Sequence, residues 1–164
     1  MTAEQEIQNK IRELINHVNQ TIPVDWDELY INCEMSETGG MIYFFFKLKN
    51  EKNLHYSLLI PKDFQVNKDI FENLDNKTYD IARELWNIFK DNGMEAWRNF
   101  SLIYKDKKLQ TSFDYIDWNC SKFSPNDRLE FFLYKYANIL PIDDEQAHLF
   151  KTMINYQEEY GQGN

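Results

Sequence analysis

Apolar residues near the start of the chain recur every three or four positions, the spacing that gathers side chains on one face of an α-helix. Mostly Glu, Gln, Asn and Lys occupy the positions between them. Pro23 cannot continue a helix, so the pattern predicts an amphipathic helix from about Ile7 to the residue before Pro23. Its apolar face consists of Ile11, Leu14, Ile15, Val18 and Ile22.

After Pro23 the pattern changes to an alternation of apolar and polar residues, which is typical of a half-buried strand. Gly39-Gly40 favours a tight turn, and residues 41–49 then predict a second strand, apolar on both faces at its centre. A polar turn at residues 50–53 and a third alternating strand up to Pro61 complete an antiparallel meander. The first strand should bury Leu29, Ile31, Cys33 and Met35 and turn Tyr30, Asn32, Glu34 and Ser36 to its other face.

Helical spacing returns between Asp69 and Asn92, where Asn92-Gly93 is typical of a helix end. Alternation at residues 100–115 around a polar turn then predicts a second hairpin. Ser124-Pro125 favours the start of a helix, and Asp143 with Gln146 resembles the capping box of a last helix. The expected apolar stripes are Ala82, Leu85, Trp86 and Phe89; then Leu129, Phe132, Leu133 and Tyr136; and finally Leu149, Phe150, Met153 and Ile154.

The order of these elements is α-β-β-β-α-β-β-α-α, without a repeat or a linker. It predicts a single α+β domain over residues 1–164, with helices packed on an antiparallel sheet of about five strands. Four Trp, ten Tyr and twelve Phe indicate a core built around large rings. Phe44, Phe46, Trp86, Phe89 and Phe132 fall on positions that we expect in this core.

Charge narrows the class of partner. The net charge is −9, and a field of that sign repels phosphate backbones and anionic lipid headgroups. Residues 109–164 carry 4 basic and 9 acidic groups, whereas residues 67–108 carry 8 of each. We therefore expect a basic protein as partner, rather than nucleic acid or a membrane. No apolar run is long enough to span a bilayer and no apolar signal segment opens the chain, so we expect a cytoplasmic protein.

The residue types that carry chemistry are sparse and scattered. His17, His55 and His148 fall on three different predicted elements without the local pairs of a metal site. Cys33 and Cys120 lie far apart without a CxxC spacing, and both are interpreted as buried thiols. Glycine-rich phosphate loops and nucleophile motifs are missing, so we expect neither a metal nor a cofactor nor catalysis.

Two groups of carboxylates are the residues that could support catalysis. Asp114 and Asp117 could serve a small hydrolase, but Asp114 alternates with Phe113 and Tyr115 and should face solvent. Residues 143–145 (Asp143, Asp144, Glu145) fall where a helix N-terminus favours acids. We interpret both groups as solvated charge that is available to a partner.

Three aromatic residues do not fit the predicted core. Phe131 and Tyr134 lie off the stripe of their helix, and Trp118 follows a strand in a loop beside acids. Exposed aromatic side chains rimmed by charge are typical of protein interfaces. Two hypotheses stay open: these rings bind a partner, or a neighbouring helix covers them. The candidate partner-binding residues are therefore Asp114, Asp117, Trp118, Phe131, Tyr134, Asp143, Asp144 and Glu145.

Residues 113–139, FDYIDWNCSKFSPNDRLEFFLYKYANI, resemble the YezG-like immunity proteins, the antitoxin family that includes the EsaG type. Such chains have a similar length, an acidic amphipathic opening helix and an aromatic strand, here Tyr43–Phe46. They also share a strand end like Tyr115–Trp118, a helix with a YKY run like Tyr134–Tyr136, and a following proline like Pro141. None of these elements is a catalytic signature.

The resemblance implies a cytoplasmic antitoxin that binds and silences a secreted nuclease toxin of the type VII or polymorphic-toxin kind. An acidic protein can occlude or distort the basic cleft that a nuclease presents to its substrate. Two alternatives remain. The chain could be an interaction module for a partner that is no nuclease, or a small hydrolase that uses Asp114 and Asp117.

Overall fold

The computed structural model describes residues 1–161. Its helices are α1 (Ala3–Thr21), α2 (Ile60–Phe64), α3 (Lys68–Asp91), α4 (Pro125–Ala137) and α5 (Asp144–Tyr160). Its strands are β1 (Trp26–Ser36), β2 (Gly39–Leu48), β3 (Leu54–Tyr56), β4 (Asn99–Lys105) and β5 (Lys108–Asp114). Single 3-10 turns, η1 (Ser57–Leu59) and η2 (Trp118–Cys120), precede α2 and α4. Apart from these short additions, the predicted order and the α+β class are confirmed.

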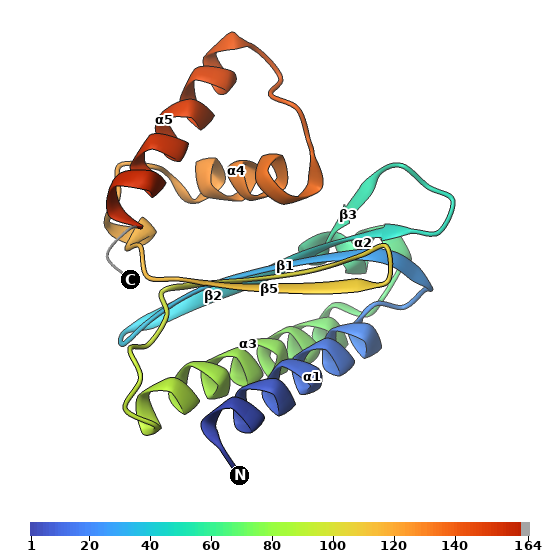
Figure 1. Cartoon of the computed structure of the whole chain (residues 1–164). Coiled ribbons are helices and arrows are strands. Elements are labelled where there is room, and N and C mark those ends of the chain that lie inside the picture. Colours follow the sequence, from blue (N-terminus) through green and yellow to red (C-terminus); the bar gives the residue numbers. More distant parts are fainter. Residues whose placement is uncertain (162–164) are drawn as a thin grey trace.

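The five strands form one antiparallel sheet in the order β3-β2-β1-β4-β5. Helices α1 and α3 lie side by side on one face, and α4 and α5 lie on the other (Figure 1). The molecule therefore has three layers, which we call the lower helices (α1 and α3), the sheet and the upper helices (α4 and α5). Among residues 1–161, no helix is both long and apolar enough to cross a bilayer.

The main core lies between the sheet and the lower helices. The predicted stripes of α1 and α3 are buried there against the apolar face of β1 and the centre of β2. Trp86 of α3 is 6% exposed, and its indole N–H donates a hydrogen bond of 2.9 Å to the carbonyl of Trp97. The five aromatic residues assigned to the core are all buried, so this part of the prediction is confirmed.

The half-buried character expected of β1 is wrong. Tyr30 and Asn32, on the face expected to be polar and open, are only 1% and 6% exposed. The reason is the upper layer, because the stripe of α4 packs over this face. Phe132 meets Tyr43 edge-on with ring centroids 6.0 Å apart, in a cluster that also contains Tyr30, Phe45 and Ile103. The central strands are consequently covered on both faces.

The third strand is shorter than predicted. β3 ends at Tyr56, and the chain then enters η1 and α2, with Pro61 in the first turn of α2. Pro61 has no N–H to donate to a ladder, and it is well suited to a first helical turn. Ser57 replaces the missing strand pairing, since its buried hydroxyl accepts a hydrogen bond of 3.1 Å from the Phe44 N–H.

The first hairpin is confirmed, but its turn lies two residues earlier than expected, at Glu37-Thr38. Gly39 and Gly40 belong to β2 instead. Gly40 is required by close approach, because a Cβ atom there would lie 2.3 Å from the Glu34 carbonyl oxygen. In the second hairpin, Asp106 and Lys107 both adopt positive φ (53° and 60°), as a two-residue turn of the primed type demands.

Candidate partner-binding surface

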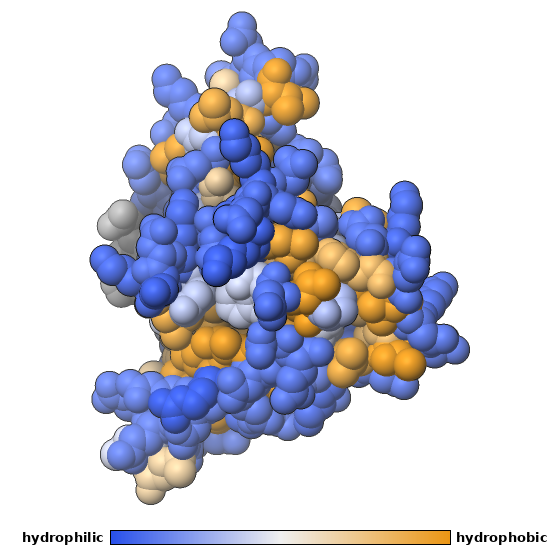
Figure 2. All heavy atoms as spheres, turned by 90° about the vertical axis from the view of Figure 1, so that its right-hand side faces the viewer, coloured by the Kyte–Doolittle hydropathy of each residue, from blue (hydrophilic) through white to orange (hydrophobic). Residues whose placement is uncertain are grey.

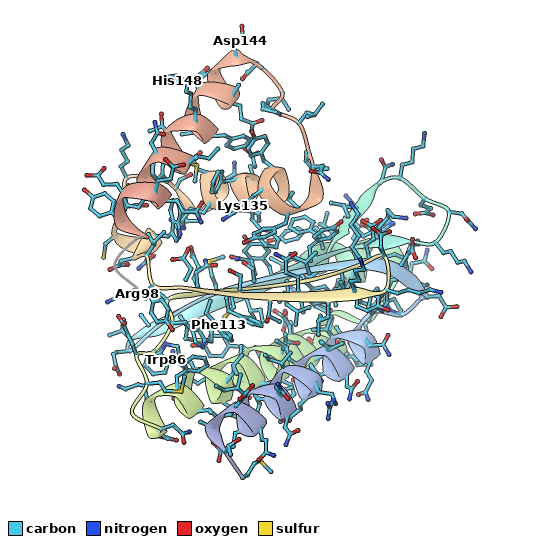
Figure 3. All side chains as sticks on the ribbon, in the orientation of Figure 1. Trp86, Arg98, Phe113, Lys135, Asp144 and His148 are labelled. Atoms are coloured by element: carbon cyan, nitrogen blue, oxygen red, sulfur yellow. The ribbon has the colours of Figure 1, made fainter. Side chains whose placement is uncertain are left out.

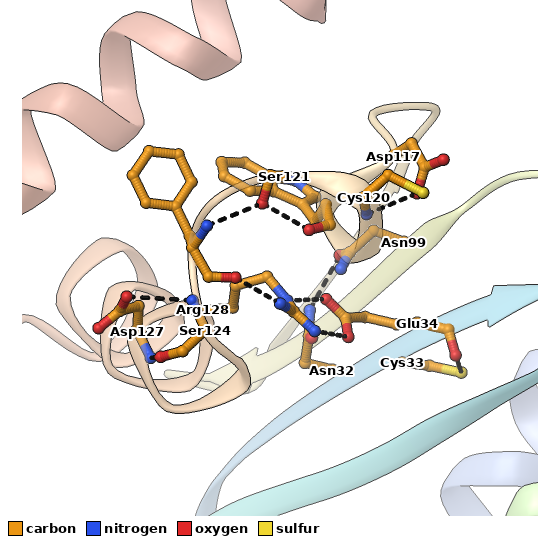
Figure 4. Close-up of polar contacts among 12 residues, drawn as sticks. Asn32, Cys33, Glu34, Asn99, Asp117, Cys120, Ser121, Ser124, Asp127 and Arg128 are labelled. Carbon is orange, nitrogen blue, oxygen red and sulfur yellow. Dashed lines mark hydrogen bonds and ion pairs between the residues drawn. The ribbon is translucent and has the colours of Figure 1, made fainter.

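Helix α4 is fastened to the sheet by a largely buried ion pair. The Arg128 Nε and Nη2 atoms donate hydrogen bonds of 2.7 Å and 3.0 Å to the two carboxylate oxygens of Glu34 on β1. Nη1 donates a third bond of 2.7 Å to the Phe123 carbonyl (Figure 4). The side chains of Arg128 and Glu34 are only 10% and 13% exposed. Such a bidentate pair fixes the direction in which α4 leaves the sheet.

A polar cleft of about 330 Å³ lies between the sheet and the upper helices. Asn32 forms part of its floor and donates hydrogen bonds to the Asn99 Oδ1 (2.9 Å) and the Ser101 Oγ (3.0 Å). Lys135 of α4 and Asp114 of β5 line the same cleft. Asn32, which the sequence placed on the open face of β1, thus forms its hydrogen bonds with polar side chains of β4 beneath α4.

Asp114 is not the solvated side chain that alternation predicted. Its carboxylate accepts hydrogen bonds from the Ile116 N–H (2.6 Å) and the Trp118 indole N–H (3.3 Å). Burial raises the pKa of the Asp114 carboxyl above its ordinary value, although these two hydrogen bonds oppose the shift. The low exposure of Asp114 has a tertiary cause, because the chain turns away from the sheet after β5 and brings the upper helices over this residue.

Asp117 has different hydrogen-bond and charge partners from Asp114. It accepts a hydrogen bond from the Cys120 N–H, as the N-cap of η2, and pairs with Arg98 at 3.1 Å. It lines a second cleft, beside the β1–β2 hairpin, which Asp114 does not line.

Cys120 itself is exposed, so its assignment as a buried thiol is wrong, whereas Cys33 is buried as expected. Within residues 1–161, no three His, Cys, Asp or Glu side chains gather as metal ligands would.

The aromatic residues proposed for an exposed interface are covered instead. Trp118 and Phe131 are 7% and 6% exposed, and they pack with Phe150 and Met153 in a small core between α4 and α5. Tyr134 is half-buried and stacks on Phe150 with ring centroids 4.7 Å apart. Of the two hypotheses left open by the sequence, the structure therefore supports the one in which a neighbouring helix covers these rings. A role of these residues in binding stays a prediction, acting through the shape of the upper helices.

The acids at the start of α5 are exposed, as expected. Asp143, Asp144 and Glu145 all face solvent, and no basic side chain within residues 1–161 pairs with them. Figure 3 shows Asp144 at the end of the molecule farthest from the lower helices. Asp143 is the N-cap and accepts a 2.8 Å bond from the Gln146 N–H, but Gln146 bonds back to Ile142 rather than to Asp143. The capping box is therefore displaced by one residue.

The α4–α5 connection exposes apolar residues that the sequence interpretation did not single out. Leu140 and Ile142 are 77% and 82% exposed, and Ile139 is 46% exposed. Hydrophobic atoms consequently lie on the surface at the top of the molecule, among hydrophilic ones (Figure 2). One signal could have revealed them, since residues 139–142 are apolar yet fall outside the stripes of both flanking helices.

Residues 7–151 match the model of a family described as "Immunity protein YezG-like". The chain belongs to this family. It is 29% identical over 160 residues to the "Type VII secretion system protein EsaG" of Staphylococcus aureus, covering 97% of this chain and 98% of that protein. It is 28% identical over 129 residues to the "Immunity protein YezG" of Bacillus subtilis, covering 78% of this chain and 85% of that protein. A YezG protein of Bacillus spizizenii is 25% identical over 150 residues, covering 91% and 89%.

The family resemblance inferred from residues 113–139 is thus confirmed. In this YezG-like chain those residues include the end of β5, η2 and α4, which together hold the upper helices on the sheet. An immunity role means that the chain works by binding a toxin. At the top of the upper helices, exposed acids lie next to exposed apolar residues.

Proposed function

We propose that this chain is a cytoplasmic immunity protein that binds and silences a secreted nuclease toxin, of the type VII or polymorphic-toxin kind, in the cell that makes it. The observation that carries the proposal is the match of residues 7–151 to a family of immunity proteins. The name of the EsaG relative supports the type VII connection. The proposed interface uses the eight residues assigned from the sequence, with the acids of α5 in direct contact.

The charge of the chain supports a nuclease as the target. A nuclease must present a basic cleft to its phosphate substrate, and an acidic surface is complementary to that cleft. The upper helices, residues 125–160, carry seven acidic and three basic residues, and one of those basic residues, Arg128, is neutralised by Glu34. Binding there would silence the toxin either by occluding its active site or by distorting it.

Neutralisation can be measured directly with the purified nuclease domain of a candidate cognate toxin. We expect an equimolar amount of the chain to abolish cleavage of plasmid DNA by that domain. The chain alone should leave the plasmid intact. Cleavage by the chain alone that is lost in Asp114→Asn or Asp117→Asn would support the hydrolase alternative instead. Binding without any change in a nuclease activity would favour the interaction module.

Association of this chain with a basic toxin domain should depend on salt. Exposed charges act over a Debye length of about 10 Å at 0.1 M salt, before contact forms, so they steer the encounter. We expect the on-rate for the basic toxin domain to fall about tenfold or more between 0.05 M and 0.5 M salt, while the off-rate changes less. Reversing Asp144 and Glu145 to Lys should slow association in the same way. Stopped-flow fluorescence at several salt concentrations measures both rates.

The control for this prediction uses another helix start. Asp69 and Glu72 are exposed in the first turns of α3, within residues 67–108, where charge is balanced. Reversing them to Lys changes the net charge equally but should leave the on-rate nearly unaltered. Asp143 is kept, or changed only to Asn, because its side chain caps α5. An on-rate indifferent to both salt and the reversal at α5 would contradict electrostatic steering.

A further inference from the structure

The α4–α5 connection forms an apolar projection that the fold itself does not use. We call residues 139–142 the apolar ridge. Between residues 2 and 161, Leu140 and Ile142 are the most exposed large hydrophobic side chains, at 77% and 82%. Neither belongs to any of the three hydrophobic clusters. Keeping such side chains in water costs free energy that burial against a partner would recover.

The ridge has a fixed backbone. Asn138 ends α4 in the left-handed conformation (φ 58°), and the Ile139 N–H donates a hydrogen bond of 3.3 Å to the Leu133 carbonyl. At the other end the Ile142 N–H donates a bond of 2.8 Å to the Gln146 side chain. Gln146 in turn donates a bond of 2.6 Å to Glu130 of α4. A loop held in this way loses little conformational freedom on binding, which favours affinity.

A shallow groove continues the apolar surface from the ridge along α5. Ile142, Phe123 and Leu149 contribute apolar side chains to its lining. Asp143 and Glu145 line the same groove. Lys122 and His148 also contribute to the lining, so the surface combines exposed apolar side chains with a charged and polar rim, the arrangement of an interface core and its polar edge.

We propose that the apolar ridge inserts into an apolar recess on a basic protein surface, and that its burial sets how long the complex lasts. The inference rests on the proposed function, so the occupant to which it commits is the toxin domain. Charge complementarity selects this occupant, because Asp143, Asp144 and Glu145 flank the ridge without a basic partner in residues 1–161. The same acids repel a second copy of this chain in a symmetric ridge-to-ridge contact.

The experiment compares two double variants in binding to the nuclease domain of a cognate toxin, chosen as the domain that the unaltered chain neutralises. In Leu140→Ser/Ile142→Ser we expect the Kd to rise about thirtyfold or more, almost entirely through a faster off-rate. The on-rate should stay within about threefold, because the acids that steer the encounter are intact. Surface plasmon resonance gives both rates.

The matched control is Leu58→Ser/Leu59→Ser. These neighbouring residues of η1 are 50% and 44% exposed and lie on another part of the molecule. Their replacement should change the Kd less than threefold. Both double variants should keep the thermal midpoint of the unaltered chain within a few degrees, because none of the four side chains is buried.

The outcomes separate the two proposals. If the unaltered chain does not bind the nuclease domain, the proposed function is wrong, and the inference that rests on it falls too. If the unaltered chain binds and the ridge variant binds equally well, only the inference is wrong. Sedimentation tests the remaining occupant: a dimer of the unaltered chain that the ridge variant abolishes would assign the ridge to a second copy.

Discussion

Replacing Arg128 with Met is expected to lower the free energy of unfolding by about 3–5 kcal/mol, because it leaves the Glu34 carboxylate without its charged partner in a largely buried site. Three hydrogen bonds of 2.7–3.0 Å are lost at the same time. The pair also fixes α4 on β1, so the variant should loosen the upper helices first. Urea unfolding followed by circular dichroism gives the free energy.

A second measurement and a double variant decide whether the buried charge is the cause. Adding Glu34→Gln to Arg128→Met removes that charge, and we expect the double variant to recover part of the lost stability. Fluorescence of Trp118, which packs between α4 and α5, should change before the signal of the lower core does. A single variant as stable as the unaltered chain would show that α4 is held by its apolar stripe alone.

Replacing Trp86 or Phe132 with Ala should each cost on the order of 3–5 kcal/mol, since both rings are buried, at 6% and 4% exposure. The two losses should differ in kind. Trp86 lies in the main core and donates its indole hydrogen bond to Trp97, so its loss should destabilise the whole fold. Phe132 lies in the cluster between α4 and the sheet, so its loss should release the upper helices preferentially.

Hydrogen exchange distinguishes the two variants. In Phe132→Ala we expect faster exchange in α4 and α5 than in β1 and α3, together with weaker toxin binding even where the sheet stays folded. In Trp86→Ala, exchange should rise throughout, and binding should fall only as the folded fraction falls. Equal, uniform acceleration in both variants would contradict the division into a main core and a separately fastened upper layer.

Periodicity was sufficient to predict the regular elements, apart from α2 and the end of β3. The 3.6-residue spacing of Ala82, Leu85, Trp86 and Phe89 correctly indicated a helix with that face buried. Ser124-Pro125 correctly indicated where α4 begins, because N-cap preference and the fixed φ of proline are local properties. The family resemblance of residues 113–139 was also available from the sequence, and with it the immunity role.

Exposure was predicted less well, because it depends on which layer covers a residue. Alternation in β1 indicated one apolar face, but it could not show that α4 would return over the other and bury Tyr30 and Asn32. Trp118 and Phe131 lie off the stripe that faces the sheet. They are nonetheless buried, because α5 offers a second surface for them to pack against.

The sequence by itself determined the elements of this protein, their order, its acidic charge and its family, since each follows from local spacing, composition or a contiguous pattern. Only the tertiary structure decided which polar and aromatic residues remain at the surface. It half-buried Asp114 beneath the upper helices, and it left Leu140 and Ile142 uncovered at their tip. The physical reason is that burial is a property of pairs of surfaces, and residues far apart in the chain supply the second surface of each pair.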